Sequence, residues 1–237
     1  MSRSYSVIVP VLGEEERINA LVDHIRTVGY GRRVEILVAD GHPQRTTLSA
    51  LERPGVLAVP APCGRARQMN AAARHAGGEV LVFLHADCAL PGGAFEAMDE
   101  LLADGTRQAG AFDLGIRSAR WSLRLIARMA SLRSRLTLTP YGDQAQFFTH
   151  AAFDALGGFT DMPILEDVDI MVRARRAGLR IGFAKGRTQA SPRRWEAEGV
   201  WRRTFLNWYI ILLYILGVPP ERLAPLHRAA GPLKENS

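Results

Sequence analysis

Residues 83–91, FLHADCALP, join an apolar run to polar side chains and so indicate how the chain folds. Residues 80–84 are apolar and mostly branched or aromatic, which is typical of a buried β-strand. Because ligands bind at the carboxyl ends of strands in open α/β sheets, we expect His85 and Asp87 to face a substrate. Their i, i+2 spacing lets an imidazole and a carboxylate approach one cation. The alternative is that Asp87 caps the following turn and His85 is a satisfied polar residue.

The sequence on either side of this stretch alternates between strand and helix patterns. Further strands are expected at residues 5–9, 34–38 and 56–59, the first one stopped by Pro10, and helices at residues 14–28 and 65–76. Such alternation is typical of an α/β fold with a Rossmann-like, mostly parallel sheet flanked by helices. The sequence has neither GxGxxG after the first strand nor GxxxxGK[ST] anywhere, so a dinucleotide or P-loop site is not indicated.

Composition narrows the class of protein. The 237 residues suit one large domain, and they carry a net charge of +6 in which Lys185 and Lys234 are the only lysines. An arginine-rich surface fits phosphate, an anionic membrane or nucleic acid, or reflects a GC-rich genome. The two cysteines, Cys63 and Cys88, indicate neither a disulfide framework nor a structural zinc site. We expect no signal peptide, since residues 5–11 are too short an apolar stretch and three glutamates follow, and therefore a cytoplasmic protein.

Several expected strand ends carry residues suited to a nucleotide. Three of the strands are followed by such residues: residues 10–14, Asp40 with Gly41, and His85 with Asp87. The stretch GRARQMN begins an expected helix and carries two arginines. Acids near a base and ribose, with arginines and a metal near the phosphates, would bind a nucleotide.

The order of the motifs IVPVLGEEE, VADG, GRARQMNAAA, FLHADC, GGF and LEDVD resembles the family 2 glycosyltransferases. The resemblance covers about residues 5–217. It implies the GT-A fold, in which a nucleotide-sugar half, here residues 1–91, precedes an acceptor half, residues 92–220; we expect a helical C-terminal part and a tail at residues 221–237. The stretches YGDQAQFF, PILEDVDIMVRARRAG and SPRRWEAEGVWRRTFLNW look most like the bacterial subgroup named for arsenosugar biosynthesis.

The resemblance also assigns the donor side of the site. It places Pro10, Val11 and Glu14 beside the nucleotide, Asp40 on the uracil or ribose, and Arg67 near the diphosphate. Asp87 matches the last acid of the family's DxD metal motif, which implies Mg²⁺ or Mn²⁺. His85 stands in place of the first acid of that motif, and residues 40–45, DGHPQR, differ from the common DGGSxD.

On the acceptor side the resemblance makes Asp167 the catalytic base. The alternative for Glu166, Asp167 and Asp169 is a capping role, since all three lie in the expected first helical turn. Asp143 and Gln144 are candidate sugar-hydroxyl ligands or part of a turn. Arg194 and Trp195 match a basic and aromatic clamp over the diphosphate and acceptor, or are a solvated arginine beside a packed tryptophan.

Two stretches without acidic residues suggest contact with a surface. Arg117, Arg120, Arg124 and Arg128 recur every three or four positions among apolar residues, as in a basic amphipathic helix. The helix either packs on the core, lies on a membrane or borders an anionic acceptor. The apolar run at residues 205–218 is shorter than the ~20 residues of a membrane span, so we expect a buried or membrane-lying helix.

Together these features predict a glycosyltransferase that moves a sugar from a nucleoside diphosphate, most simply UDP, to an acceptor hydroxyl with inversion and a divalent ion. The acceptor is open, with a lipid-linked or arsenical molecule among the options. We do not expect nucleic acid as a partner. We do expect peripheral contact with the inner face of the membrane. A nucleotidyltransferase and a non-catalytic nucleotide-sugar or membrane-binding module are the alternatives.

Overall fold

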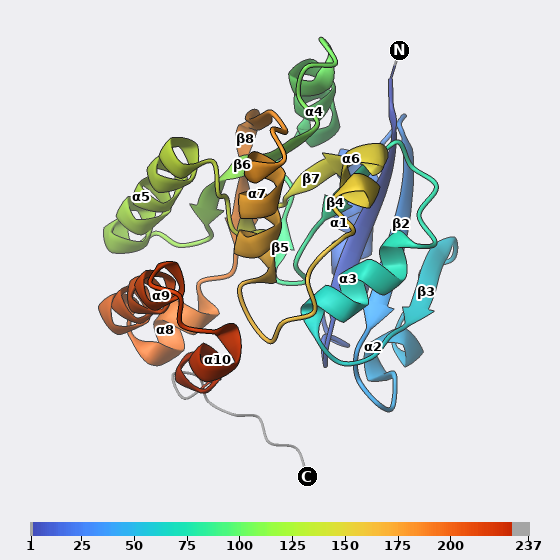
Figure 1. Cartoon of the computed structure of the whole chain (residues 1–237). Coiled ribbons are helices and arrows are strands. Elements are labelled where there is room, and N and C mark those ends of the chain that lie inside the picture. Colours follow the sequence, from blue (N-terminus) through green and yellow to red (C-terminus); the bar gives the residue numbers. More distant parts are fainter. Residues whose placement is uncertain (1, 229–237) are drawn as a thin grey trace.

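The computed structural model describes residues 2–228, which form an eight-stranded sheet in the order β3-β2-β1-β4-β7-β6-β8-β5 (Figure 1). The strands are β1 (Ser4–Val11), β2 (Arg33–Asp40), β3 (Val56–Pro60), β4 (Val80–Phe83), β5 (Cys88–Ala89), β6 (Ala109–Ile116), β7 (Phe147–Thr149) and β8 (Ile181–Ala190). β1 to β4 pair in parallel, and β6 pairs in parallel with β8. β7 is antiparallel to both β4 and β6, and β5 is antiparallel to β8.

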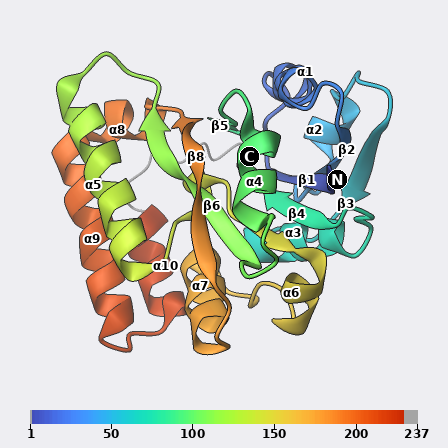
Figure 2. The ribbon, with the colours of Figure 1, turned by 90° about the horizontal axis from the view of Figure 1, so that it is seen from above.

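Helices cover both faces of the sheet. They are α1 (Ile18–Val28), α2 (Thr46–Ser49), α3 (Arg65–Ala73), α4 (Ala94–Leu102), α5 (Trp121–Thr137), α6 (His150–Ala155), α7 (Glu166–Arg176), α8 (Arg193–Glu198), α9 (Val200–Ile215) and α10 (Pro220–Arg228). Side chains of α1, α4 and α5 share one buried cluster, and those of α3, α6 and α7 share another. Figure 2 shows α5, α8, α9 and α10 gathered beside β6 and β8.

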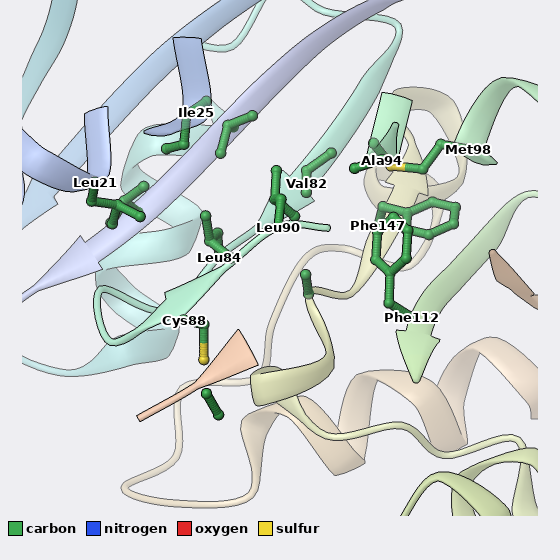
Figure 3. Close-up of a cluster of buried hydrophobic side chains, with 14 of the residues drawn as sticks. Leu21, Ile25, Val82, Leu84, Cys88, Leu90, Ala94, Met98, Phe112 and Phe147 are labelled. Atoms are coloured by element: carbon green, nitrogen blue, oxygen red, sulfur yellow. The ribbon is translucent and has the colours of Figure 1, made fainter. Parts of the chain in front are cut away.

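The central strands are apolar throughout because both of their faces are buried. In β1, Val7 and Val9 belong to the cluster under α1, whereas Ile8 between them belongs to the cluster under α3. Buried parallel strands show such continuous apolar runs. Figure 3 shows the first cluster, in which Val82 and Leu84 meet Leu21 and Ile25 of α1.

The expected α/β sheet is confirmed, with two differences. β1 continues through Pro10 to Val11, although we expected Pro10 to stop it. Its pairing with β4 ends at Ile8 and Phe83, so Pro10, which lacks an N–H, interrupts no bond on that side. The second half is mixed, because the antiparallel β7 lies between β4 and β6.

The C-terminal helices form a separate small apolar cluster. Ile210 of α9 packs with Leu223 and Ala224 of α10 and with Ile164, in the loop before α7. Residues 221–228 of the expected tail belong to the packed helix α10, while residues 229–237 lie outside the described part of the chain. None of the helices in the described residues is long and apolar enough to cross a membrane.

Candidate active site

A cavity of about 150 Å³ lies at the carboxyl end of β4. The β4 to β5 loop provides Asp87, the start of α3 provides Arg65, and the start of α7 provides Asp167. Residues of α9 and α10 line it too, so these helices cover it. The cavity is lined by Arg65, His85, Asp87, Cys88, Tyr141, Asp143, Ile164, Leu165, Asp167, Val168, Ala190, Ser191, Trp195, Arg203, Asn207, Ile210, Ile211 and His227.

His85, Asp87 and Cys88 bring three ligand atoms within 4.8 Å of one another. The Cys88 thiol donates to Asp87 Oδ1 over 3.6 Å, and burial raises the pKa of this thiol, which disfavours the thiolate form that binds metals. One carboxylate and one imidazole remain, with the other positions open to phosphate oxygens. Mg²⁺ is commonly held by one or two carboxylates plus substrate phosphates, and carboxylates also suit Mn²⁺. The residues present therefore fit such an ion.

The Asp87 backbone is fixed from two directions. Its carbonyl accepts a hydrogen bond from Ser191 N at 3.0 Å, just beyond β8, and one from the Arg117 guanidinium at 3.3 Å. Cys88 N donates to His85 O at 3.0 Å and closes the turn. The turn is thus closed by backbone hydrogen bonds, and Asp87 lines the cavity.

Asp167 lies in the first turn of α7 and lines the same cavity. Its Oδ2 accepts from Gly142 N at 2.6 Å, and its Oδ1 accepts from Val168 N at 2.8 Å. Each oxygen of a carboxylate has two acceptor positions, so one remains on each. The side chain is therefore held in place and can still accept a proton from a bound hydroxyl.

Gly142 brings His85 and Asp167 together. A Cβ at this position would lie 2.5 Å from His85 Nε2 and 3.3 Å from Asp167 Oδ2. Only glycine lets the imidazole pack this closely against the backbone. His85 and Asp167 therefore both pack against Gly142.

Glu166 is 1% exposed, and its Oε1 lies 2.9 Å from Arg65 Nε. The contact is an ion pair without hydrogen-bond alignment, since Oε1 has no hydrogen-bond partner among the described residues. Burial raises the pKa of Glu166, while the Arg65 charge opposes that shift. Conversely, Glu166 raises the pKa of Arg65, with smaller contributions from Asp167, Asp87 and Asp143. Arg65 thus pairs with Glu166 and lines the cavity together with Asp87, Asp143 and Asp167, and about a third of its side chain is exposed.

The other acceptor-side candidates differ in their surroundings. Asp143 and Trp195 line the cavity. Gln144 is fully buried: its Oε1 accepts from Ser134 at 2.6 Å and Tyr141 N at 3.1 Å, and its Nε2 donates to Phe112 O. These bonds fix the conformation of the loop, so Gln144 acts on the site by holding that loop in place. The Arg194 side chain lies outside the described residues.

The residues expected beside the nucleoside lie at and after the carboxyl ends of β1 and β2. Among the described residues, they do not line the cavity. Pro10 and Val11 are buried at the end of β1, and Glu14 pairs with Arg17 at 2.8 Å. Asp40 is fully buried, and its carboxylate accepts from His42 N at 2.7 Å and Leu48 N at 3.1 Å. Asp40 therefore holds the divergent loop that follows β2 and presents no carboxylate at the surface.

Arg67 points away from the cavity and pairs with Asp161 at 2.8 Å, with half of its side chain exposed. Arg65 occupies the cavity instead. Side chains two residues apart on a helix differ in direction by about 200°. Only one of these two arginines can therefore face the cavity. The GRAR motif predicted an arginine here, but it did not identify which.

Sequence analysis also missed the residues that α9 and α10 add. Arg203 is buried; it pairs with Glu198 at 3.2 Å and contacts His227 Nε2 at 2.7 Å. Asn207 follows one turn later on the same wall of the cavity. The stretch SPRRWEAEGVWRRTFLNW contains Arg203 and Asn207, but nothing in it singled them out from neighbours such as Arg202, and none of the quoted motifs contains His227.

The sequence model of glycosyl transferase family 2 matches residues 6–152, more than half of the chain. None of the curated proteins matches the sequence significantly. Among solved structures, the mannosyltransferase PcManGT from Pyrobaculum calidifontis, in complex with GDP-Man and Mn2+, is similar with a TM-score of 0.63 and 22% identity. The similarity covers 97% of this chain and 69% of that one.

TarS 1-349 of S. aureus, in complex with UDP-GlcNAc, also has a TM-score of 0.63, with 18% identity over 79% of this chain and 58% of that one. A longer TarS structure is similar with a TM-score of 0.59, and the chain spans 42% of its length. At these identities the structures show a shared fold. The family match and the arrangement of the sheet agree, and the chain belongs to glycosyl transferase family 2, with the GT-A fold.

Proposed function

We propose that this chain transfers a sugar from a nucleoside diphosphate to an acceptor hydroxyl with inversion, using Asp167 as the base. One observation carries the proposal: Asp87 and Asp167, which are 80 positions apart in the sequence, line the same cavity. PcManGT and TarS were solved with GDP-Man and UDP-GlcNAc, which supports a nucleotide-sugar donor. The nucleoside would lie along the ends of β1 and β2, beside Pro10, Val11 and Glu14.

The donor phosphates would lie at the end of β4. A divalent ion held by Asp87 and His85 would neutralise the charge that develops on the leaving diphosphate. Arg65 stands among the cavity acids and would add a fixed positive charge at the same place. We assign it the role that the family resemblance gave to Arg67.

Asp167 would take the proton of the acceptor hydroxyl as that oxygen attacks the anomeric carbon. The new glycosidic bond forms while the bond from that carbon to the diphosphate breaks, and the configuration inverts. Asp143 and Trp195 border the space that the acceptor would fill. The subgroup named for arsenosugar biosynthesis is a proposal for pathway context only.

The direct test is calorimetry with UDP and with GDP on the wild type and Asp87→Ala, each in Mn²⁺ and in EDTA. We expect Mn²⁺-dependent binding that Asp87→Ala abolishes. Asp154→Ala is the matched control, since it removes an exposed acid on α6. Equal affinity with Mn²⁺, with EDTA and in the Asp87 variant would refute the metal role.

A further inference from the structure

A second, larger cavity of about 390 Å³ lies between α5 and α9. Ile126 and Met129 line it from α5, and Trp208, Leu212 and Ile215 line it from α9. Its only charged residues among those described are Arg133 and Asp143. The Arg133 guanidinium stacks on the Tyr141 ring at 3.3 Å and donates to the Ser134 hydroxyl, so its charge lies against an aromatic wall.

This apolar cavity adjoins the active site. Five residues line both cavities: Tyr141, Asp143, Trp195, Asn207 and Ile211. Four of the five carry a polar atom, so the polar groups gather where the two cavities meet. A molecule in the apolar cavity would therefore have one end beside Asp143 and Asp167.

The other end opens onto an exposed apolar surface. On α5 the exposed apolar side chains recur at one face, with Trp121, Leu125, Met129, Leu132 and Leu136. On α9 a second row contains Trp201, Phe205, Trp208, Leu212 and Ile215. Met129, Trp208, Leu212 and Ile215 belong to these rows and also line the cavity. Figure 2 shows the two helices side by side.

An unused hydrogen-bond donor lies on the shared wall. Trp195 Nε1 is buried and has no hydrogen-bond partner among the described residues. Leaving a buried donor unpaired is unfavourable, and a bound oxygen atom would satisfy it. This atom points to a ligand with a polar group at the junction.

From these observations we infer that the acceptor is amphipathic: its hydroxyl-bearing head lies at the junction beside Asp167, and its apolar tail occupies the cavity between α5 and α9. The inference rests on the proposed function and names its acceptor class. The tail enters from the exposed apolar rows, as a lipid would from a membrane or micelle. The cavity thus selects acceptors by tail length.

The test uses n-alkyl glucosides with tails of one to eight carbons, below their micelle concentrations, and follows tryptophan fluorescence without any donor. Trp195 and Trp208 line the cavity and report binding. Each buried methylene contributes about 0.8 kcal/mol, so we expect the dissociation constant to fall up to about fourfold per carbon. A constant that does not change with tail length overturns the inference.

Two variants on α9 localise the effect. Leu212 lines the cavity and is 53% exposed, whereas Tyr209 is 52% exposed and lines neither cavity. Leu212→Glu should remove the dependence on tail length, and Tyr209→Glu should keep it. If both variants behave alike, or if sedimentation shows that the wild type is a dimer held by this surface, the inference fails.

A transfer assay separates this inference from the proposed function. With UDP- or GDP-sugars and Mn²⁺, we expect octyl glucoside to be glycosylated with a lower KM than methyl glucoside. Transfer with equal KM values overturns the amphipathic acceptor but leaves the transferase intact. If the glucosides bind in order of tail length while no donor binds, the proposed function fails and the apolar site stands.

Discussion

At the scale of single residues, the acids of α7 have different surroundings although they are close in sequence. Asp167 faces the cavity, whereas Asp169 accepts from Thr160 and Arg173, both at 2.7 Å. General-base assistance is worth about 10² to 10⁴ in rate, so we expect Asp167→Asn to lose that factor in turnover while donor affinity is kept. Asp169→Asn should keep turnover and lose about 1–3 kcal/mol of stability.

Steady-state kinetics and urea unfolding of these two variants check the assignment, with donor affinity measured by calorimetry. If Asp169→Asn were inactive and Asp167→Asn active, the base would lie on the other face of α7. If both were active, neither acid would be the base, and Glu166→Gln would test the remaining acid of this turn.

Glu166 makes the stability of the fold depend on pH. Burial raises its pKa above the ordinary value of 4.5, against the opposing Arg65 charge. The folded state therefore binds this proton more tightly than the unfolded chain does. The resulting stability is complete below pH 4.5 and is lost as pH rises through the raised pKa.

We therefore expect the unfolding free energy of the wild type, relative to Glu166→Gln, to fall as pH rises above 4.5. Urea unfolding between pH 4 and pH 8 measures this difference. Glu100→Gln is the control, since Glu100 is an exposed glutamate paired with Lys185. A difference that rises with pH would mean that the ion pair with Arg65 outweighs burial.

At the scale of elements, α5 carries a basic and an apolar surface at once. Arg120, Arg124 and Arg128 are exposed, and none of them pairs with a carboxylate in the described part of the chain. Arg117 precedes the helix and contacts the Asp87 carbonyl, so we leave it out of this surface. An anionic membrane attracts each such arginine by about 1 kcal/mol, and salt screens the attraction.

We expect that changing these three arginines to glutamine lowers the affinity for anionic vesicles by up to about 10²-fold at low salt. Vesicle sedimentation measures this affinity. The control changes Arg33, Arg74 and Arg180, which are exposed and lie away from α5, to glutamine and removes the same charge. Equal binding by the two triple variants would assign the effect to net charge. Recovery of the wild type in the supernatant would exclude membrane contact under these conditions.

At the scale of the whole molecule, donor binding should stabilise the fold because the site joins β1, β4, α3, α7 and α9. A ligand at 100 times its dissociation constant adds about 2.7 kcal/mol to the unfolding free energy. For a chain of this size that corresponds to a rise of roughly 5–10 °C in Tm. Thermal unfolding with a panel of nucleotide sugars, with and without Mn²⁺, should identify the donor base and sugar.

The shift should require both the nucleotide sugar and Mn²⁺, and Asp87→Ala should lack it. A shift from Mn²⁺ alone, of equal size in the Asp87 variant, would show that the ion acts elsewhere. Absence of a shift with every nucleotide sugar would count against the proposed donor class.

The sequence by itself determined the α/β class, the strands of the first half and the place of His85 and Asp87. These depend on local pattern, since a buried strand is apolar along its whole length and its end is marked by the first polar residues. The order of motifs determined the family. Asp167 was proposed as the base by resemblance, because three acids in one helical turn have no local difference that separates a base from a cap.

Only the tertiary structure decided which side chains meet. Arg65 rather than Arg67 lines the cavity, Asp40 and Gln144 are used within the protein, and Arg203 closes the site from α9. Each outcome depends on the direction of a side chain relative to an element distant in sequence. Helical periodicity gives the angle between the side chains of neighbouring residues on one helix. The packing of that helix on the sheet decides which of these side chains face the interior.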